Sequence, residues 1–542
     1  MKRLFAFILM LMFGTPCFAQ EQSAVKDTAG MPKLEIPEIT IVGKKAITLP
    51  FARKGEIYDV TIYDAPPPDT SLLNERPAIP LPVGALPRYE EPLVPLHISG
   101  EASLGSFTTG NARGFVDYNE KLWGVYGNAG FNTTQGHTDH ASGSSVDAEV
   151  HGHSLIPTDN TVLNMFRVAG GMRAEHDSYG LFGFVDTTVD RTSNDVSMNI
   201  GFGTVNCESN AFDLNFSADI RSLTDHRLGV DSGASAVSPS VEASYKTNVD
   251  SVQVLTHFSY IGSSLDYNSA AQSPRLINLS VGGKWQLVDR VSLELGGKYD
   301  DGTGSNGEDR MIIAPFGEVK WEFDHDRVFS LWLRPEMTLE TYSDYIKQIP
   351  YLVREPDIRP ERKPVQFGGT FWYNSGILSL EVNGSFAKSS NTAIVIASHG
   401  EIYLDYVDAS KLFFRGDATF RLEHDLLLSL FGVIQPMVED GTTTQLPMTP
   451  LVNIGARGET SFDSPVTVWS TLEYVSKQNI DRAATMTLGD HAILSAGCSA
   501  TVFNKVVVAA TIDNLFNTAY QWWNSYLAPG RSIMLNAKVN IQ

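Results

Sequence analysis

The chain has 542 residues, of which 41 are Lys or Arg and 62 are Asp or Glu, so its formal net charge is −21. This acidic balance argues against a nucleic-acid-binding protein, because such proteins need a basic surface. Hydrophobic residues make up 42% of the chain. That fraction is low for a helical membrane protein but normal for a membrane barrel, in which half of each strand is polar.

Residues 1–19 have the organisation of a cleaved signal peptide. Lys2 and Arg3 precede the apolar run LFAFILMLMF, and the small residue Ala19 lies just before Gln20. The apolar run is too short to cross a bilayer, which disfavours the alternative of a membrane anchor. No later apolar run is long enough for a membrane helix.

Residues 20–95 form a separate Pro-rich segment. Positions 21–95 hold 12 of the 27 prolines, a composition that favours extended chain and opposes a packed sheet. One β-branched island interrupts the prolines, and it consists of Glu38, Ile39, Thr40, Ile41 and Val42. This island is either a strand that adds to the sheet edge of a partner or an apolar anchor in a tail.

Residues 96–542 read as strand after strand. In SGILSLEVNGSF, residues 375–386, apolar or small residues alternate with polar ones, so the two sets lie on opposite faces of a β-strand. One such strand fits a soluble sandwich as well as a membrane barrel. Later strands, such as 412–423, also carry Arg, Asp and Glu on the polar face, which suits a wet interior better than a dry core. We therefore expect the face of Leu378 to meet lipid and that of Glu381 to meet the lumen.

The connections between these strands alternate between short and long. Tight turns are expected at 324–326, 374–376, 463–465 and 503–505, and longer polar loops at 135–144, 178–192, 223–236, 267–275, 302–309, 342–363, 437–449, 478–490 and 518–528. Such sorting by parity is typical of outer-membrane barrels. With 162–188 taken as one strand and its loop, the sequence predicts an all-β, transmembrane antiparallel β-barrel of about 22 strands.

Two further groups of residues are candidate functional features. Aromatic residues near strand ends, such as Trp372, Tyr373, Trp522 and Trp523, suit interfacial girdles, and the alternative is that they are ordinary core residues. Five residues with zinc or copper ligand types lie close in sequence: His137, Asp139, His140, His151 and His153. We favour the alternative that they are ordinary polar residues of a loop and of the lumen. The sequence therefore predicts no metal and no other cofactor. No phosphate loop or nucleophile elbow occurs, so the sequence predicts no enzyme.

Several motifs resemble those of TonB-dependent outer-membrane receptors. The segment 356–362, PDIRPER, with the strands that follow it, resembles the PE loop and hairpin of that family. Residues 513–520, DNLFNTAY, and 526–532, YLAPGRS, resemble its terminal hairpin, and Gly105-Ser106-Phe107 resembles its first barrel hairpin. The resemblance covers residues 96–542 and implies a barrel in the outer membrane of a Gram-negative-type bacterium.

The chain departs from that family before the barrel. The family carries a globular plug there, whereas this chain has only the Pro-rich segment, so we expect the plug to be absent or reduced to an extended piece in the periplasm or the lumen. By resemblance, the strand Glu38–Val42 would engage a TonB-like periplasmic partner. The leading hypothesis is a barrel that binds or transports an unknown solute. The alternatives are a scaffold or partner-binding barrel whose lumen the N-terminal segment occupies and, ranked last, a barrel enzyme.

Overall fold

The computed structural model describes residues 96–157, 165–183, 189–205, 210–227, 230–267, 270–353, 356–398, 401–422, 426–461, 465–502 and 505–541. The signal peptide and the Pro-rich segment expected from the sequence lie outside these residues. No helix among the described residues has the length and apolar composition needed to cross a membrane.

The described chain is almost entirely β-structure, with one α-helix, α4 (Tyr342–Gln348), and one 3-10 turn, η1 (Ser106–Thr108). The strands are β1 (Leu96–Gly105), β2 (Thr109–Asn119), β3 (Trp123–Thr134), β4 (Gly143–Pro157), β5 (Met165–Gly180), β6 (Val189–Thr204), β7 (Asn210–Arg227), β8 (Val230–Val249), β9 (Val252–Gly262), β10 (Ser264–Tyr267), β11 (Ala270–Gln272), β12 (Arg275–Val288), β13 (Val291–Thr303), β14 (Asp309–Asp324), β15 (Arg327–Leu333), β16 (Glu336–Thr338), β17 (Glu361–Asn374), β18 (Leu378–Ser398), β19 (Glu401–Leu422), β20 (Leu426–Ile434), β21 (Met437–Glu439), β22 (Val452–Ser461), β23 (Val466–Val475), β24 (Gln478–Asn479), β25 (Thr487–Leu488), β26 (His491–Val502), β27 (Val506–Asp513), β28 (Gln521–Trp523), β29 (Tyr526–Leu527) and β30 (Ser532–Ile541).

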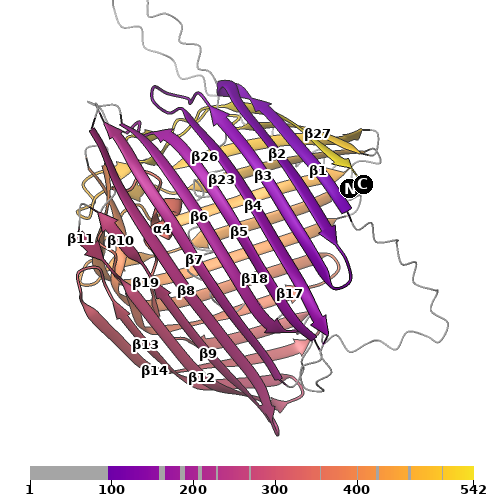
Figure 1. The fold of residues 1–542 in the computed structure, drawn as a ribbon, viewed down its shortest axis with the longest axis vertical. Helices are drawn as coiled ribbons and strands as arrows, with labels where there is room; N and C mark the ends of the chain where they lie inside the picture. The colour runs from indigo at the N-terminus through magenta and orange to yellow at the C-terminus, as the bar shows by residue number, and fades with distance from the viewer. Residues whose placement is uncertain are drawn as a thin grey trace, which may run out of the picture. The chain divides into compact units, whose positions relative to one another are not determined.

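The long strands form a closed antiparallel barrel of 22 strands. Each strand of the barrel pairs with the next one along the chain, and the first pairs with the last, since β1 lies against β30 from Ile98↔Ile541 to Gly105↔Met534. Figure 1 shows the indigo strand β1 beside the yellow C-terminal strands. The predicted barrel and its strand number are confirmed, and residues 165–180 form one strand, as the sequence indicated.

The two ends of the barrel differ in their connections. One end, here called the turn end, carries tight turns such as the one between β8 and β9, together with the start of β1 and the end of β30. The opposite end, called the loop end, carries most of the longer connections, so the predicted alternation holds for most hairpins, although the β1–β2, β7–β8 and β18–β19 connections at that end have only two or three residues. Some predicted loops are strand instead. Residues 223–227 and 230–236 pair as the tip of the β7–β8 hairpin, because the ladder continues beyond the body of the barrel.

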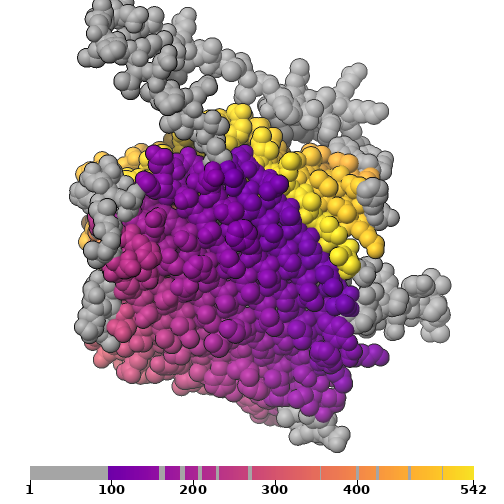
Figure 2. Space-filling view, turned by 45° about the horizontal axis from the view of Figure 1, so that its top comes forward, coloured from indigo at the N-terminus to yellow at the C-terminus, as the bar shows by residue number. Residues whose placement is uncertain are grey.

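Apolar and charged side chains lie on opposite faces of the wall. Leu331, Phe367, Phe414, Leu430 and Leu472 lie on the same face and are 43–54% exposed. The alternate residues include Glu381 and Asp417, which are cross-strand partners. Figure 2 shows the continuous outer surface that β1 and the following strands present. The outward face is thus apolar and the inward face charged, as expected for the Leu378 and Glu381 faces.

Three of the four aromatic residues expected in interfacial girdles do not lie on the outward face of the barrel. Trp372 pairs with Glu381 and therefore faces the lumen, whereas its neighbour Tyr373 faces outward next to the turn end. Trp523 is only 7% exposed and packs in an internal cluster at the loop end, and Trp522 packs against the same cluster. The run of three aromatic residues at 371–373 hides the alternation of faces, which explains the wrong prediction for Trp372.

A charge placed on the outward face tests this assignment of faces. Leu430 lies in the middle of β20 and faces outward, while Phe431 faces inward opposite Asp417. We expect Leu430→Lys to destabilise the barrel by about 2–4 kcal/mol and Phe431→Lys to cost less, because only the first puts an ammonium into lipid. Urea unfolding in lipid vesicles measures both, and equal losses would contradict the assignment.

Candidate functional site

The connection between β16 and β17 folds into the barrel rather than away from it. We call its described residues, 339–353 and 356–360, the crossing connection. Its helix α4 begins at a capping box, in which Thr341 Oγ1 accepts from the backbone N–H of Asp344 at 3.3 Å and the Asp344 carboxylate accepts from the backbone N–H of Thr341 at 2.8 Å. Figure 1 places α4 within the ring of strands, towards the end that bears β10 and β11.

Arg191 of β6 holds the crossing connection against one wall. Its guanidinium donates to both oxygens of Asp225, at 2.7 and 3.0 Å, and also to the backbone carbonyls of Pro350 and Leu352, at 2.8 and 2.7 Å. The Arg191 side chain is 2% exposed. Tyr179 adds a hydrogen bond to the Pro350 carbonyl at 2.9 Å. The buried guanidinium of Arg191, which is paired with Asp225, thus donates hydrogen bonds to two backbone carbonyls that lie outside the helix and the barrel strands.

The helix makes a second ionic contact with the same wall. Lys347 of α4 lies 3.2 Å from Asp195 of β6, and Arg221 of β7 donates to the same carboxylate at 2.7 Å. Asp195 and Arg221 are almost fully buried. The inward-facing charges of β6 and β7 therefore position the crossing connection.

The opposite wall contacts the same short segment. Leu352 forms a parallel bridge with Ile402 of β19, and the backbone N–H of Val353 donates to the Ile402 carbonyl at 2.8 Å. Between β6 and β19 the ring passes through β7, β8, β9, β12, β13, β14, β15, β17 and β18 on one side, and through the remaining strands on the other. The two strands are therefore nearly opposite, and residues 350–353 bridge the bore at the loop end.

An apolar cluster fills the space around this bridge. It includes Tyr342, Ile346, Leu352 and Ile358 of the crossing connection, together with Leu181, Leu223, Leu276, Ile402, Met448, Ile480 and Tyr526 from connections and strand ends around the ring. Tyr351 stacks on Tyr526 with ring centroids 3.9 Å apart. The cluster resembles the hydrophobic core of an ordinary globular domain. Here it is assembled from residues at the loop ends of many strands.

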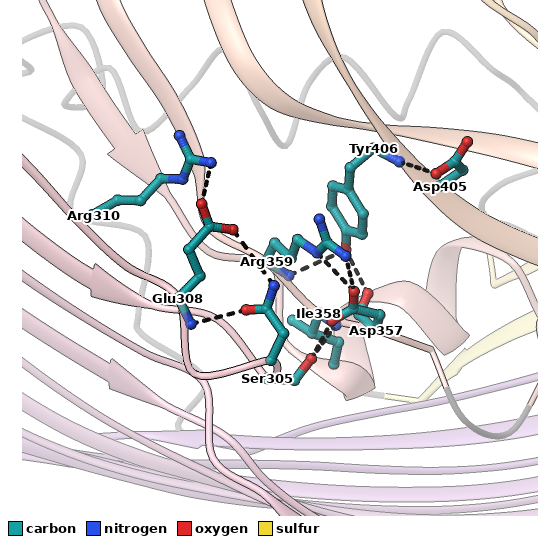
Figure 3. A network of polar contacts seen from close by, with 9 residues as sticks. Ser305, Glu308, Arg310, Asp357, Ile358, Arg359, Asp405 and Tyr406 are labelled. Carbon is teal, nitrogen blue, oxygen red and sulfur yellow. Dashed lines mark hydrogen bonds and ion pairs between the residues drawn. The ribbon is translucent and has the colours of Figure 1, made fainter.

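A polar network fixes the far end of the crossing connection (Figure 3). Ser305, in the β13–β14 connection, donates to Asp357 at 2.5 Å and accepts from the backbone N–H of Ile358 at 2.8 Å. Tyr406 of β19 donates to the Asp357 carbonyl at 2.6 Å and accepts from the backbone N–H of Arg359 at 3.1 Å. The PE-like segment is therefore bound to β19 and to the β13–β14 connection at once.

A cavity of about 220 Å³ lies beside the crossing connection. Its polar wall holds Glu340, Glu361, Lys363 and Lys411, and Lys363 also binds Glu336 at 2.8 Å. Burial, with the nearby carboxylates of Asp344 and Glu361, raises the pKa of Glu340 to about 7. This cavity is the candidate ligand site, since it combines partial enclosure, apolar surface and a few charged groups.

The residues singled out from the sequence are placed as follows. Glu38, Ile39, Thr40, Ile41 and Val42 lie outside the described residues. His151 and His153 share the inward face of β4, but His151 bonds Glu149, and His137 packs against Phe182 near the apolar cluster. Among the described residues, no group of three His, Cys, Asp or Glu side chains could hold a metal ion.

Sequence reasoning missed Arg191, Asp225, Glu340 and Lys411. The span 342–363 was expected to be an outside loop, yet it contains the helix and the bridge. A signal was present, because Thr341 and Asp344 have the spacing of a capping box ahead of apolar residues. No comparable signal marks Arg191, whose partner Leu352 is 161 positions away in the chain.

No model of a known protein family matches the chain, and no curated protein matches it. Its fold is similar to that of the FrpB iron transporter from Neisseria meningitidis (F5-1 variant), with 9% identity and a TM-score of 0.67, covering 82% of each chain. The copper transporter OprC gives 11% identity and a TM-score of 0.65, covering 82% of this chain and 81% of the other. BauA, the ferric preacinetobactin receptor from Acinetobacter baumannii, gives 12% and 0.63, covering 82% and 80%. These neighbours are TonB-dependent receptors, and the likeness shows that this chain shares their barrel fold.

Removal of the buried arginine tests the role of the bridge. We expect Arg191→Met to remove the donor that the Asp225 carboxylate and the carbonyls of Pro350 and Leu352 share, at a local cost of about 3–5 kcal/mol. The backbone amides of Ile349 and Val353 would then exchange hydrogen at least ~100-fold faster, since each 1.36 kcal/mol is tenfold.

Arg173→Met is the matched control, because Arg173 also faces the lumen but is half-exposed and pairs with Glu175. It should leave the exchange of both amides unchanged. If Arg191→Met exchanges as slowly as the unmodified chain, Arg191 does not hold the bridge.

Proposed function

We propose that this protein is an outer-membrane barrel that binds a solute at its loop end and passes it across the membrane. The observation that carries the proposal is the closed 22-strand barrel with an apolar outward face and a charged inward face. The neighbours with this fold are described as an iron transporter, a copper transporter and a ferric preacinetobactin receptor. In this chain the longer connections at the loop end would face outside the cell and select the solute.

The bridge across the bore favours a second candidate, a barrel that does not transport. Residues 350–353 connect opposite walls, and the apolar cluster around them has the composition of a stable core. If the bridge never opens, the barrel would serve as a scaffold whose lumen the N-terminal segment occupies. We favour transport because a solute in the candidate site would contact Gln348 and Ile349 of the crossing connection, directly before the bridge.

The strand Glu38–Val42 is proposed to bind a TonB-like periplasmic partner by adding to the edge of its sheet. Ile41→Pro should abolish that binding, because proline removes a ladder N–H. Titration calorimetry of the full chain with a TonB C-terminal domain measures it, and Thr28→Pro, which lies outside the strand, is the matched control. Equal affinities of the two variants would contradict the assignment.

Single-channel conductance in a planar bilayer tests transport itself. An open barrel of this size would conduct strongly. We therefore expect little conductance from the full chain and more after deletion of residues 21–95 combined with Arg191→Met. Each change alone shows which element limits flow. Absence of conductance from every form would favour the scaffold and overturn the transport proposal.

A further inference from the structure

The cavity beside the crossing connection is built from several separate parts of the fold. Its lining comes from the crossing connection, from β17, β18 and β19, and from the β20–β22 connection. Because these parts are fixed by the barrel wall and by the bridge, the cavity is formed without any ligand. A preformed, partly enclosed cavity favours binding, since little ordering is required of the protein.

The charges around the cavity do not balance within it. Lys411 forms an ion pair with Glu361, while Lys363 lies 2.8 Å from Glu336 and 3.6 Å from Glu361. The third carboxylate, Glu340, has only the Gln348 amide as a hydrogen-bonding partner and no ion pair within 4.0 Å in the part of the chain that the structure describes. Of the two carboxylates that line the cavity, Glu361 is thus paired with lysine and Glu340 is not.

The remaining positive charge near the cavity is already engaged. Arg359 donates to the Asp357 carboxylate at 2.7 Å and stacks over Tyr406. Lys347, in the last turn of α4, binds Asp195 of β6. Neither side chain is therefore placed to neutralise Glu340, and a half-buried carboxylate without a cation is costly.

The cavity lining also includes apolar side chains, namely Val395, Leu404, Met437, Leu446, Met448 and Trp523. Apolar surface beside one carboxylate without an ion pair suits a molecule with a single positive end and a hydrocarbon body. The volume of about 220 Å³ suits a small molecule.

We propose that this cavity binds a small organic monocation, such as a primary amine with an apolar body, whose ammonium group pairs with Glu340. The inference names the ligand class for the site given above, and it rests on that site being where the solute binds. It does not depend on energy coupling or on passage through the barrel, since binding is measured on the solubilised protein.

Calorimetry with three probes of matched shape tests the proposal: 2-phenylethylamine, 2-phenylethanol and 3-phenylpropanoate. At pH 8 the amine should bind the full chain at least ~10-fold more tightly than the alcohol, and the carboxylate should bind least. Glu340→Gln should remove this preference. Glu308→Gln is the matched control, because Glu308 pairs with Arg310 outside the cavity lining.

The pH dependence of the unmodified chain gives a second readout that needs no variant. At pH 5.5, below the raised pKa of Glu340 of about 7, its carboxyl group is protonated, so the preference for the amine should fall. The charged and titratable groups that act on Glu340 are Asp344, Glu361, Lys363, Lys411 and Tyr345. The proposal is overturned if amine and alcohol bind alike at pH 8, if Glu340→Gln keeps the preference, or if the amine fails to bind at millimolar concentration. Failure here with normal conductance would leave transport standing and remove only the ligand class.

Discussion

A sheet surrounded by lipid cannot have a free edge, because unpaired backbone groups have no water to bond with there. Here the constraint is met by the ladder between β1 and β30, which joins residues more than 400 positions apart. Once that ladder forms, every strand has two neighbours and every inward side chain faces a common space. The pattern of apolar residues outside and charged residues inside follows from this single closure.

Closure creates the problem of how to occupy the space within. In this protein a chain segment from one connection enters the bore and reaches the opposite wall. Arg191 makes this possible, because its five donors can satisfy a carboxylate and two backbone carbonyls together. The apolar cluster then shields this ion pair from water, and the pair holds the apolar segment in place. The cavity with Glu340 lies between the crossing connection and the strands β17, β18 and β19.

The barrel could be predicted from sequence because its signals are local. Alternation around Leu378 and Glu381 fixes two faces within a few residues, and the parity of connection lengths fixes two ends. The bridge could not be predicted in this way. Contacts such as that between Arg191 and the Leu352 carbonyl depend on which strands are opposite in the closed ring, and periodicity does not report this. The span 342–363 is polar enough to resemble a surface loop, and only the capping box at Thr341 indicated a helix.

The bridge between β6 and β19 also has a mechanical consequence. A hollow cylinder under uneven lateral pressure flattens into an ellipse, and its softest deformation changes the length of one diameter. A tie fixed to both ends of a diameter opposes that deformation directly. Residues 350–353, bonded to Arg191 on one side and to Ile402 on the other, are such a tie. Release of residues 350–353 would therefore open the bore and, at the same time, make the barrel easier to flatten.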